Sequence, residues 1–442
     1  MAETPISPPY SQFEAPTAPR SPVLKRLVVV LFYVFALYMA LPIIDVPLLG
    51  LSLSAPIFFV IALEVLFRPR RAWLRRYRRW VLLAAALWLA IFLSALLNGI
   101  LSGGVDFDSD GLNIVIHYAY WLLVFVVTAY LVSEGGLGPG VSALLGWGAF
   151  LLALLRWGEV LLYSNLGAWS GTHLLTQNTY GFIFSTFAPF TFNLLVRSRG
   201  RARWLAALAN IVLWGAAAVN GSRGSWVAIG AAVAVQLGLL LFVRLRSARL
   251  PLLVVLATVA LGALVLATPN PVARAVEQRF STFNNLQEDK SYAIRLLMNQ
   301  KALRLFEENP LIGVGTARFR KESTPLVLPP VLQYAYQDFF DRRSAHNSYL
   351  GFLAECGLLG AVPYGLLLLT LTLKGGSAAF FLAKRGQYWA AGVYAGFVGM
   401  SIHMWAVNSL TNSGNWMVYG LAAALIVTAG RLRRAERMGQ AA

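Results

Sequence analysis

Two arginines and one histidine, each near a boundary between apolar and polar sequence, are the residues of this chain best suited to chemistry. Arg223 lies in the hairpin NGSRGSW, where small neighbours let an anion approach both the guanidinium group and backbone N–H groups. The N-terminus of the following helix adds a positive dipole there. The alternative is an interfacial arginine that reaches lipid phosphates. The hairpin thus predicts an anion site at Arg223.

Arg295 opens the segment RLLMNQKALRLFEEN, whose apolar residues recur at the three- and four-residue spacing of a helix. Lys290, Lys301 and Arg304 add positive charge nearby in the sequence. If Arg295 points toward the membrane, it provides a second cation for the same anion. Otherwise it belongs to a solvated helix face and pairs with neighbouring glutamates.

His346 stands in AHNSYLGFL, where a polar stretch gives way to a long apolar one. A helix start and nearby arginines should hold its pKa down, so that the imidazole is neutral and able to accept a proton. Asn347 could orient this ring or bind a hydroxyl group. The alternative is an interfacial histidine that caps the helix. We predict that His346 is a general base.

Two cations and a neutral base suit one particular reaction. A diphosphate leaving group needs cations to take up the charge that develops on its oxygens. An incoming sugar hydroxyl needs a base that removes its proton. Since the chain is strongly apolar, the membrane would supply a lipid carrier for the diphosphate. The residues therefore predict glycosyl transfer from a lipid-diphosphate donor.

The elements that position these residues are apolar helices. The chain is 58% hydrophobic and only 13% charged, whereas a soluble protein carries about a quarter of its residues as charged ones. Apolar stretches recur at close to the ~20 residues that cross a bilayer as a helix. We predict an all-α polytopic membrane protein with about 12 transmembrane helices, at 24–41, 51–67, 80–97, 113–132, 140–163, 177–196, 204–219, 225–243, 250–267, 346–373, 388–407 and 415–431.

Basic residues gather after the second, sixth and eighth predicted spans and in the C-terminal tail, as expected of cytoplasmic connections. This distribution explains the net charge of +18 without a nucleic-acid partner. The connection 133–139, SEGGLGP, has no basic residue and is the weakest point of the topology. Twelve spans place both termini in the cytoplasm.

The predicted organisation has five parts. They are a disordered cytoplasmic tail at 1–23, transmembrane helices 1–9 at 24–267, a periplasmic loop at 268–345, transmembrane helices 10–12 at 346–431 and a cytoplasmic tail at 432–442. Cys356 is the only cysteine, so the loop must fold without an internal disulfide. Its helical patterns, AVEQRF and YAIRLLMNQKALRLFEEN, and its turn PLIGVGTARF predict a folded cap on the membrane.

At these residues the chain resembles the superfamily of O-antigen ligases and O-antigen polymerases. The resemblance covers residues 175–365 best and rests on four pieces, TQNTYGFIF, NGSRGSW, RLLMNQKALRLFEENPLIGVGTARF and AHNSYLGFLAECGLLG. It implies a bundle similar to type C glycosyltransferases, in a bacterial inner membrane, with the active site facing the periplasm. It also implies an inverting transferase that needs neither metal nor other cofactor.

By the same resemblance, Arg223 and Arg295 bind the diphosphate of an undecaprenyl-diphosphate-linked glycan, and His346 activates the acceptor hydroxyl. A ligase would use lipid A-core as acceptor, and a polymerase of O-antigen or exopolysaccharide would use a growing glycan. We rank the ligase first. The competing class is a transporter or flippase of lipid-linked glycans, which would carry charged residues through the middle of several spans.

Other polar residues could support such a site. Asn178 lies in TQNTYGFIF, and Arg156 and Glu159 lie three residues apart in the fifth predicted span, where they could serve the site or pair with each other. Glu355, His403 and Glu64 are further polar groups in apolar segments. The link DFDSDG, with Asp106, Asp108 and Asp110, opens like a calcium loop, but His117 stands where the closing glutamate is needed. We expect a solvated acidic link there.

Overall fold

The computed structural model describes residues 22–42, 54–67, 71–101, 109–162, 174–243, 245–268, 273–274, 276–277, 281, 288–332, 340 and 342–439. Within these residues all regular structure is helical. The elements are α1 (Pro22–Ala40), α2 (Ser54–Leu66), α3 (Arg71–Leu101), α4 (Ser109–Gly135), α5 (Gly138–Leu162), α6 (Gln177–Arg197), α7 (Gly200–Val219), α8 (Arg223–Val243), α9 (Leu245–Ala267), α11 (Lys290–Glu308), the 3-10 turn η2 (Pro330–Leu332), α13 (Ser348–Lys384), α14 (Trp389–His403) and α15 (Ser413–Arg437).

Each of the predicted apolar segments coincides with a helix, but not every helix is long enough to cross a bilayer. Among the described residues, 8 helices meet the length and apolarity that a crossing requires, namely α3 to α8, α13 and α15. The helix α2 has 13 residues and α14 has 15, which at 1.5 Å per residue fall short of ~30 Å. A polytopic helical membrane protein is confirmed, whereas length and composition support eight crossings rather than twelve.

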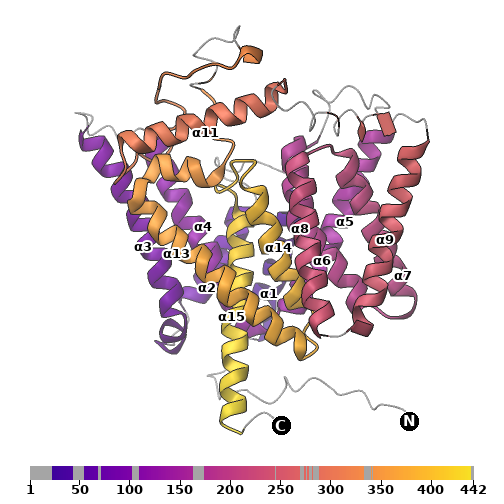
Figure 1. The fold of residues 1–442 in the computed structure, drawn as a ribbon. Coiled ribbons are helices and arrows are strands. Elements are labelled where there is room, and N and C mark those ends of the chain that lie inside the picture. The colour runs from indigo at the N-terminus through magenta and orange to yellow at the C-terminus, as the bar shows by residue number, and fades with distance from the viewer. Residues whose placement is uncertain are drawn as a thin grey trace.

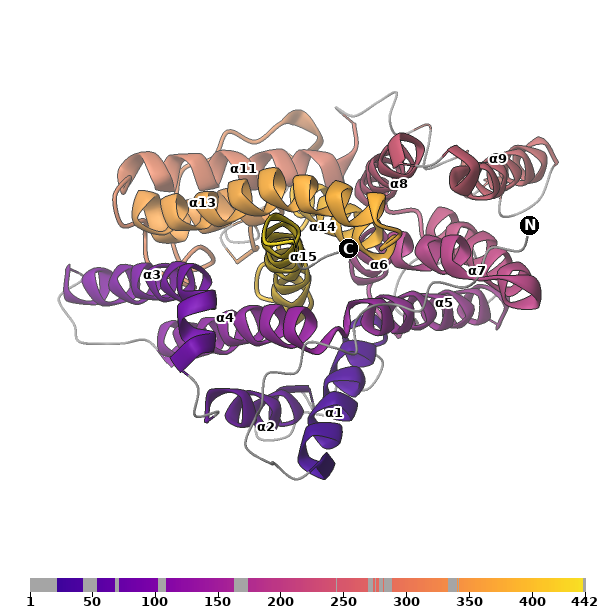
Figure 2. The ribbon, with the colours of Figure 1, turned by 90° about the horizontal axis from the view of Figure 1, so that it is seen from below.

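The helices form a bundle with one amphipathic helix across its end (Figure 1). The view along the bundle shows α15 near the centre, with α1, α2 and α9 at the periphery (Figure 2). Helix α15 packs against α4 and α13, and α6 packs against α5, α7, α8 and α14. From Tyr180 to Leu195, α6 is buried without interruption. Its neighbours are therefore held by a helix that is itself fully enclosed.

Glycines let α14 approach α6 more closely than larger residues would allow. A methyl group at Gly396 would lie 2.6 Å from the carbonyl oxygen of Thr186, and one at Gly392 would lie 3.2 Å from that of Pro189. Close packing of small residues is a common means of helix association in membranes. It brings the end of α14, with His403, next to the start of α8 and Arg223.

A second, smaller core holds α11 against α13. It includes Leu297, Met298 and Leu305 of α11, together with Phe319 and Ala354. The helix α11 covers the predicted pattern at 292–309, starting two residues earlier and ending one residue earlier. Most of AVEQRF and residues 333–339 lie outside the described residues.

The turn after α11 docks on α13 through backbone hydrogen bonds at a break in that helix. Gly357 has φ 56° and ψ −158°, so the helical hydrogen-bond ladder is interrupted there. The N–H groups of Val314 and Gly315 donate to the carbonyls of Ala354 and Glu355, and two N–H groups of α13 donate back to the turn. Backbone groups released by the break are thus satisfied by the loop. The turn fixes where α11 sits.

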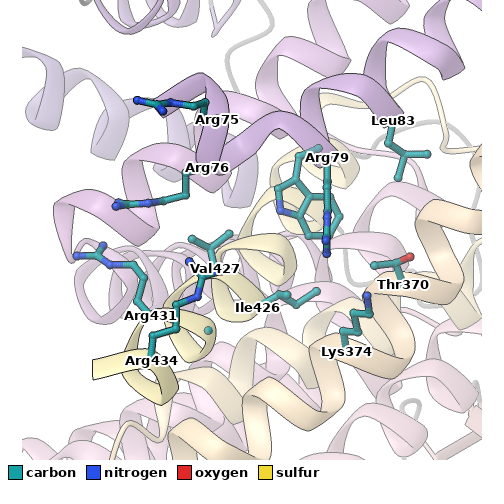
Figure 3. A pocket seen from close by; sticks show the side chains of 12 residues that line it. Arg75, Arg76, Arg79, Leu83, Thr370, Lys374, Ile426, Val427, Arg431 and Arg434 are labelled. Atoms are coloured by element: carbon teal, nitrogen blue, oxygen red, sulfur yellow. The ribbon is translucent and has the colours of Figure 1, made fainter. Parts of the chain in front are cut away.

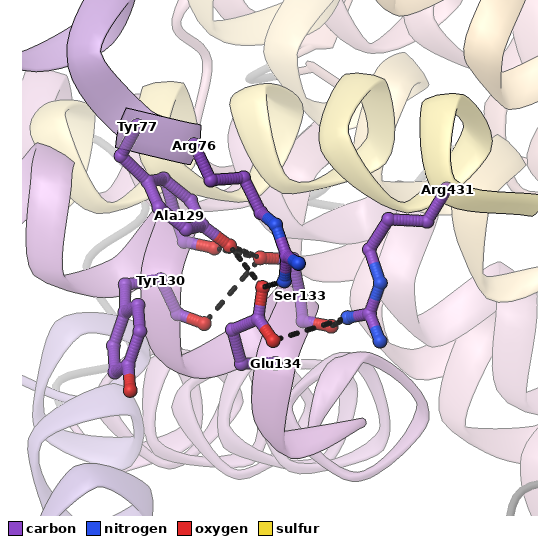
Figure 4. A network of polar contacts seen from close by, with 7 residues as sticks. All are labelled: Arg76, Tyr77, Ala129, Tyr130, Ser133, Glu134 and Arg431. Atoms are coloured by element: carbon purple, nitrogen blue, oxygen red, sulfur yellow. Dashed lines mark hydrogen bonds and ion pairs between the residues drawn. The ribbon is translucent and has the colours of Figure 1, made fainter. Parts of the chain in front are cut away.

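A polar network joins the connection between α4 and α5 to two basic helix ends (Figure 4). Glu134 accepts a hydrogen bond from Arg76 of α3 at 2.5 Å, and its second oxygen lies 3.4 Å from the Arg431 guanidinium of α15. Arg431 also donates to the carbonyl of Ser133 at 2.9 Å. The connection 133–139, which carries no basic residue itself, therefore lies at the same end as these two basic clusters.

Candidate active site at the α11 end of the bundle

The hairpin that carries Arg223 is tied to the start of α6 by two reciprocal hydrogen bonds. The side-chain Nε2 of Gln177 donates to the backbone carbonyl of Asn220 at 2.6 Å, and the side-chain Nδ2 of Asn220 donates to the backbone carbonyl of Gln177 at 2.9 Å. Gly221 has φ 66°, which L side chains rarely adopt. The segments TQNTYG and NGSRGSW, distant in sequence, thus form one rigid corner.

Close packing completes this corner. A methyl group at Gly181 would lie 2.9 Å from the Ser222 hydroxyl and 3.1 Å from the Cβ of Ser225. The hydroxyl of Ser225 donates to the carbonyl of Ser222 at 2.7 Å, within the first turn of α8. The small side chains of this corner thus let the starts of α6 and α8 pack closely.

Asp289 links Arg223 to α11. Its Oδ2 lies 2.7 Å from Nη2 of Arg223, and both side chains are only about a tenth exposed, at 10% and 11%. Its Oδ1 accepts a hydrogen bond from the N–H of Tyr292 at 2.9 Å and so caps α11. Burial raises the pKa of Asp289, but the Tyr292 N–H and Arg223 outweigh it and lower the pKa overall. A single ionised carboxylate therefore orients both the arginine and the helix.

Arg295 follows this cap on α11, and its side chain is partly buried. Burial lowers the pKa of its guanidinium, and the positive charge of Arg223 lowers it further, while Asp289 acts in the opposite direction. The two arginines are therefore within electrostatic range of each other. The Nε atom of Arg295 is buried and has no hydrogen-bond partner among the described residues. Such a donor is costly unless a ligand accepts from it.

His346 is half-buried on the segment that enters α13. Burial lowers the pKa of its imidazole, and the charges of Arg295 and Arg343 lower it further. The ring is thus neutral near neutral pH and within electrostatic range of Arg295. The predicted direction of the pKa shift agrees with this environment.

Asn347 caps α13, because its Oδ1 accepts from the N–H groups of Tyr349 and Leu350 at 3.0 and 3.1 Å. The next residue, Ser348, donates its N–H to the carbonyl of Met404 at 2.9 Å and its hydroxyl to that of Val407 at 2.7 Å. These bonds anchor the histidine segment to the link after α14. Asn347 therefore places the helix start on which His346 depends.

His403 is a further imidazole at this end of the bundle. It is fully buried, and neither ring nitrogen has a hydrogen-bond partner among the described residues. Its Cδ2 would lie 4.0 Å from a methyl group at Gly224, the residue after Arg223. The ring also lies 6.1 Å from that of Phe182, centroid to centroid. His403 therefore belongs to the wall behind the arginine corner.

Arg156 and Glu159 form a buried ion pair that supports the start of α6. Their side chains are 3% and 5% exposed, and the N–O distance is 2.7 Å. The other oxygen of Glu159 accepts from the Tyr180 hydroxyl at 3.0 Å and from the N–H of Leu174 at 2.7 Å. Of the two alternatives for this pair, the structure shows that the residues pair with each other, and Glu159 also holds the start of α6. Asn178 lies half-buried in the first turn of α6.

We expect Glu159→Gln to destabilise the protein markedly, because it leaves the Arg156 charge buried without its counter-charge. The loss should be about 3 kcal/mol, as for other broken buried pairs. The measurement is thermal unfolding in detergent micelles. The control is Glu134→Gln, whose partner Arg76 is 48% exposed, so that the loss should stay below about 1 kcal/mol. Equal losses for both variants would contradict the buried-pair interpretation.

Among the described residues, no group of three histidine, cysteine, aspartate or glutamate side chains could hold a metal ion. Asp106 and Asp108 lie outside those residues, and the side chain of Asp110 is likewise not described. The prediction about the acidic link therefore stays a prediction.

Asp289, the partner of Arg223 in the structure, was not predicted from the sequence. The available signal was its place before the helical pattern, since aspartate is a preferred N-cap residue. The ion pair between Arg223 and Asp289, two residues far apart in the sequence, could not be inferred from the local pattern.

Residues 208–365 match the sequence profile of a protein family described as O-antigen ligase. The matched segment runs from α7 into α13 and contains Arg223, Arg295 and His346. This match confirms the resemblance to the O-antigen ligase superfamily predicted from the sequence. Asn178, Arg156 and Glu159 lie outside it. No curated protein was found to match the chain.

Proposed function

We propose that this membrane protein, whose residues 208–365 match the O-antigen ligase family, transfers a glycan from an undecaprenyl-diphosphate carrier to a sugar hydroxyl of lipid A-core. The transfer takes place at the periplasmic face of the bacterial inner membrane. Arg223 and Arg295 bind the diphosphate, and His346 is the general base. The reaction inverts the anomeric centre and uses no metal.

In this reaction the acceptor hydroxyl oxygen attacks the anomeric carbon of the donor glycan. A new glycosidic C–O bond forms while the C–O bond to the diphosphate breaks. His346 takes the hydroxyl proton, and undecaprenyl diphosphate leaves with the bonding electron pair. The two guanidinium groups offset the negative charge that grows on the leaving oxygens. Asp289 keeps Arg223 oriented toward that charge.

The observation that carries the proposal is the 2.7 Å ion pair between Arg223 and Asp289, the N-cap residue of α11, which ties the arginine hairpin to the helix that carries Arg295. Arg223 acts on Arg295, and Arg295 acts on His346. They come from α8, α11 and the start of α13, so only the tertiary fold brings them near one another. Because Arg295 also has a buried donor without a partner among the described residues, the site is prepared for an anion.

The proposed orientation follows from charge at the opposite end of the bundle. Arg76 and Arg431 converge there on Glu134, and positive residues favour the cytoplasmic side. The α11 end then faces the periplasm.

The test incubates the purified protein, in lipid vesicles, with a lipid-linked glycan and either lipid A-core or no second acceptor. We expect glycan on lipid A-core and release of undecaprenyl diphosphate. Chain growth without the core would identify a polymerase instead. Movement of the intact donor between leaflets without any transfer would identify a transporter and overturn the proposal.

The rate of transfer should depend on pH through His346. Burial and nearby arginines lower the pKa of His346 below the ordinary histidine value of about 6.5. As the pH falls, the imidazole therefore stays neutral to a lower pH than a free histidine would, and activity should fall only when the ring becomes protonated. Arg343→Gln removes one of the positive charges that lower this pKa, so the acidic limb should move to higher pH. The measurement is the pH profile of the transfer rate, with Arg342→Gln as control. An unmoved limb would argue against His346 as the base.

A further inference from the structure

An open cavity of about 750 Å³ lies at the end of the bundle opposite α11, between α3, α13 and α15 (Figure 3). Six cationic side chains line it, namely Arg75, Arg76, Arg79, Lys374, Arg431 and Arg434. The proposed reaction uses none of them. The cavity is therefore separate from the candidate active site.

The positive charge of this cavity is largely uncompensated. Glu134 pairs with Arg76 and Arg431. The other four cations form no ion pair with a carboxylate among the described residues. Like charges held near one another repel, and a concave wall concentrates their potential. The cavity thus favours an anion of more than one charge.

The floor of the cavity is apolar. Trp80 is only 7% exposed, and Leu83, Ile426 and Val427 lie beside it on the lining. A soluble anion would gain nothing from these side chains, whereas the first carbons of a lipid chain would be removed from water by them. A cationic rim over an apolar floor, between membrane-spanning helices, fits a phosphorylated lipid.

The six cations come from three helices, three of them from α3, one from α13 and two from α15. Figure 3 shows Arg79 and Lys374 extending toward one another, while Arg431 and Arg434 come from α15. Arginine and lysine bind phosphate oxygens through charge-assisted hydrogen bonds. Six cationic donors spread over three helices offer more contacts than one phosphate can accept, and therefore suit two phosphates better than one.

We infer that this cavity binds the headgroup of a membrane phospholipid that carries two phosphates, with its acyl chains along Leu83 and Val427. The lipid lies in the leaflet opposite the candidate active site. It joins α3, α13 and α15 at the end of the bundle where Glu134 of α4 also contacts Arg76 of α3 and Arg431 of α15.

The test measures lipid adducts by native mass spectrometry of the purified protein in detergent. The probes are cardiolipin, phosphatidylglycerol and phosphatidylcholine, titrated separately. We expect tightest binding for cardiolipin. The triple variant Arg79→Gln, Lys374→Gln, Arg434→Gln should bind it roughly 100-fold more weakly, if each cation contributes as basic residues do near anionic lipids. These three residues form no ion pair among the described residues, so their replacement should leave the melting temperature unchanged.

The matched control is Arg78→Gln, Arg199→Gln, Arg201→Gln, which removes the same charge from exposed positions at the same end. It should bind cardiolipin within about twofold of the original protein, because those residues do not line the cavity. Equal weakening by both triple variants would overturn the inference, since it would show attraction by net charge alone. Complete competition by inorganic diphosphate, or tighter binding of undecaprenyl diphosphate than of cardiolipin, would also overturn the assignment to a phospholipid.

Discussion

Replacing His346 with alanine should reduce glycan transfer by a factor of about 10² to 10⁴, the usual contribution of a general base. The acceptor hydroxyl then loses the group that takes its proton, while the two arginines remain. Binding of undecaprenyl diphosphate should therefore stay close to that of the unmodified protein. The measurements are the single-turnover rate of transfer and the dissociation constant of the lipid diphosphate.

The control for this variant is His117→Ala. His117 lies on α4 and bonds through Nδ1 to the Asn113 carbonyl of its own helix at 2.7 Å. It has no place in the proposed reaction, so transfer should continue at nearly the original rate. Transfer by His346→Ala within about threefold of the original would contradict the proposed base, and would leave the topology intact.

Gly357→Ala should detach the turn after α11 from α13 and destabilise the protein by about 3 kcal/mol or more. The added methyl group would meet the Gly313 nitrogen and the Leu311 carbonyl at 2.6 Å, at a φ of +56° that alanine rarely adopts. The backbone hydrogen bonds between turn and helix cannot survive that contact. Because the turn positions α11, Arg295 should lose its place and transfer should fall with stability.

Two other glycines, Gly365 within α13 and Gly386 just after its end, distinguish steric contact from backbone strain. Gly365→Ala in α13 meets nothing within 4 Å and should be neutral or stabilising by up to about 1 kcal/mol. Gly386→Ala has a φ of +78° but also meets nothing within 4 Å, so it should cost only about 1 to 2 kcal/mol of conformational strain. Thermal unfolding and limited proteolysis of the turn measure these effects. A melting temperature of Gly357→Ala equal to that of Gly365→Ala would refute the docking role.

Much of the local architecture follows from the sequence. Apolar runs bounded by arginines and glycines predicted where helices form, because each such helix satisfies its own backbone hydrogen bonds in lipid. The helical pattern of YAIRLLMNQKALRLFEEN likewise predicted α11. The number of membrane crossings was harder to predict from the sequence, because hydropathy shows that a segment is apolar but not whether it extends through the full bilayer. The 13 residues of α2 illustrate the difference.

The residues proposed for the reaction could also be identified in the sequence, from their residue types and their neighbours. An arginine between small residues, and a histidine at the start of an apolar helix, are unusual enough to be noticed without a structure. How these residues are arranged relative to one another could not be predicted from the sequence. Asp289 reaches Arg223 only because α11 lies across the end of the bundle, and that placement depends on the break at Gly357. A glycine within a long apolar run gives no sign that a distant turn will occupy its hydrogen-bonding groups.

The sequence by itself determined that this is a helical membrane protein, which end of it is basic, and which cations and which imidazole are available for chemistry. Charge, hydropathy and residue type act locally, so they can be interpreted one segment at a time. Only the tertiary structure decided that Asp289 orients Arg223, that Asn347 caps α13, and that six cations of three helices share one cavity. Those relationships arise from packing between segments distant in the chain, and no local pattern encodes them.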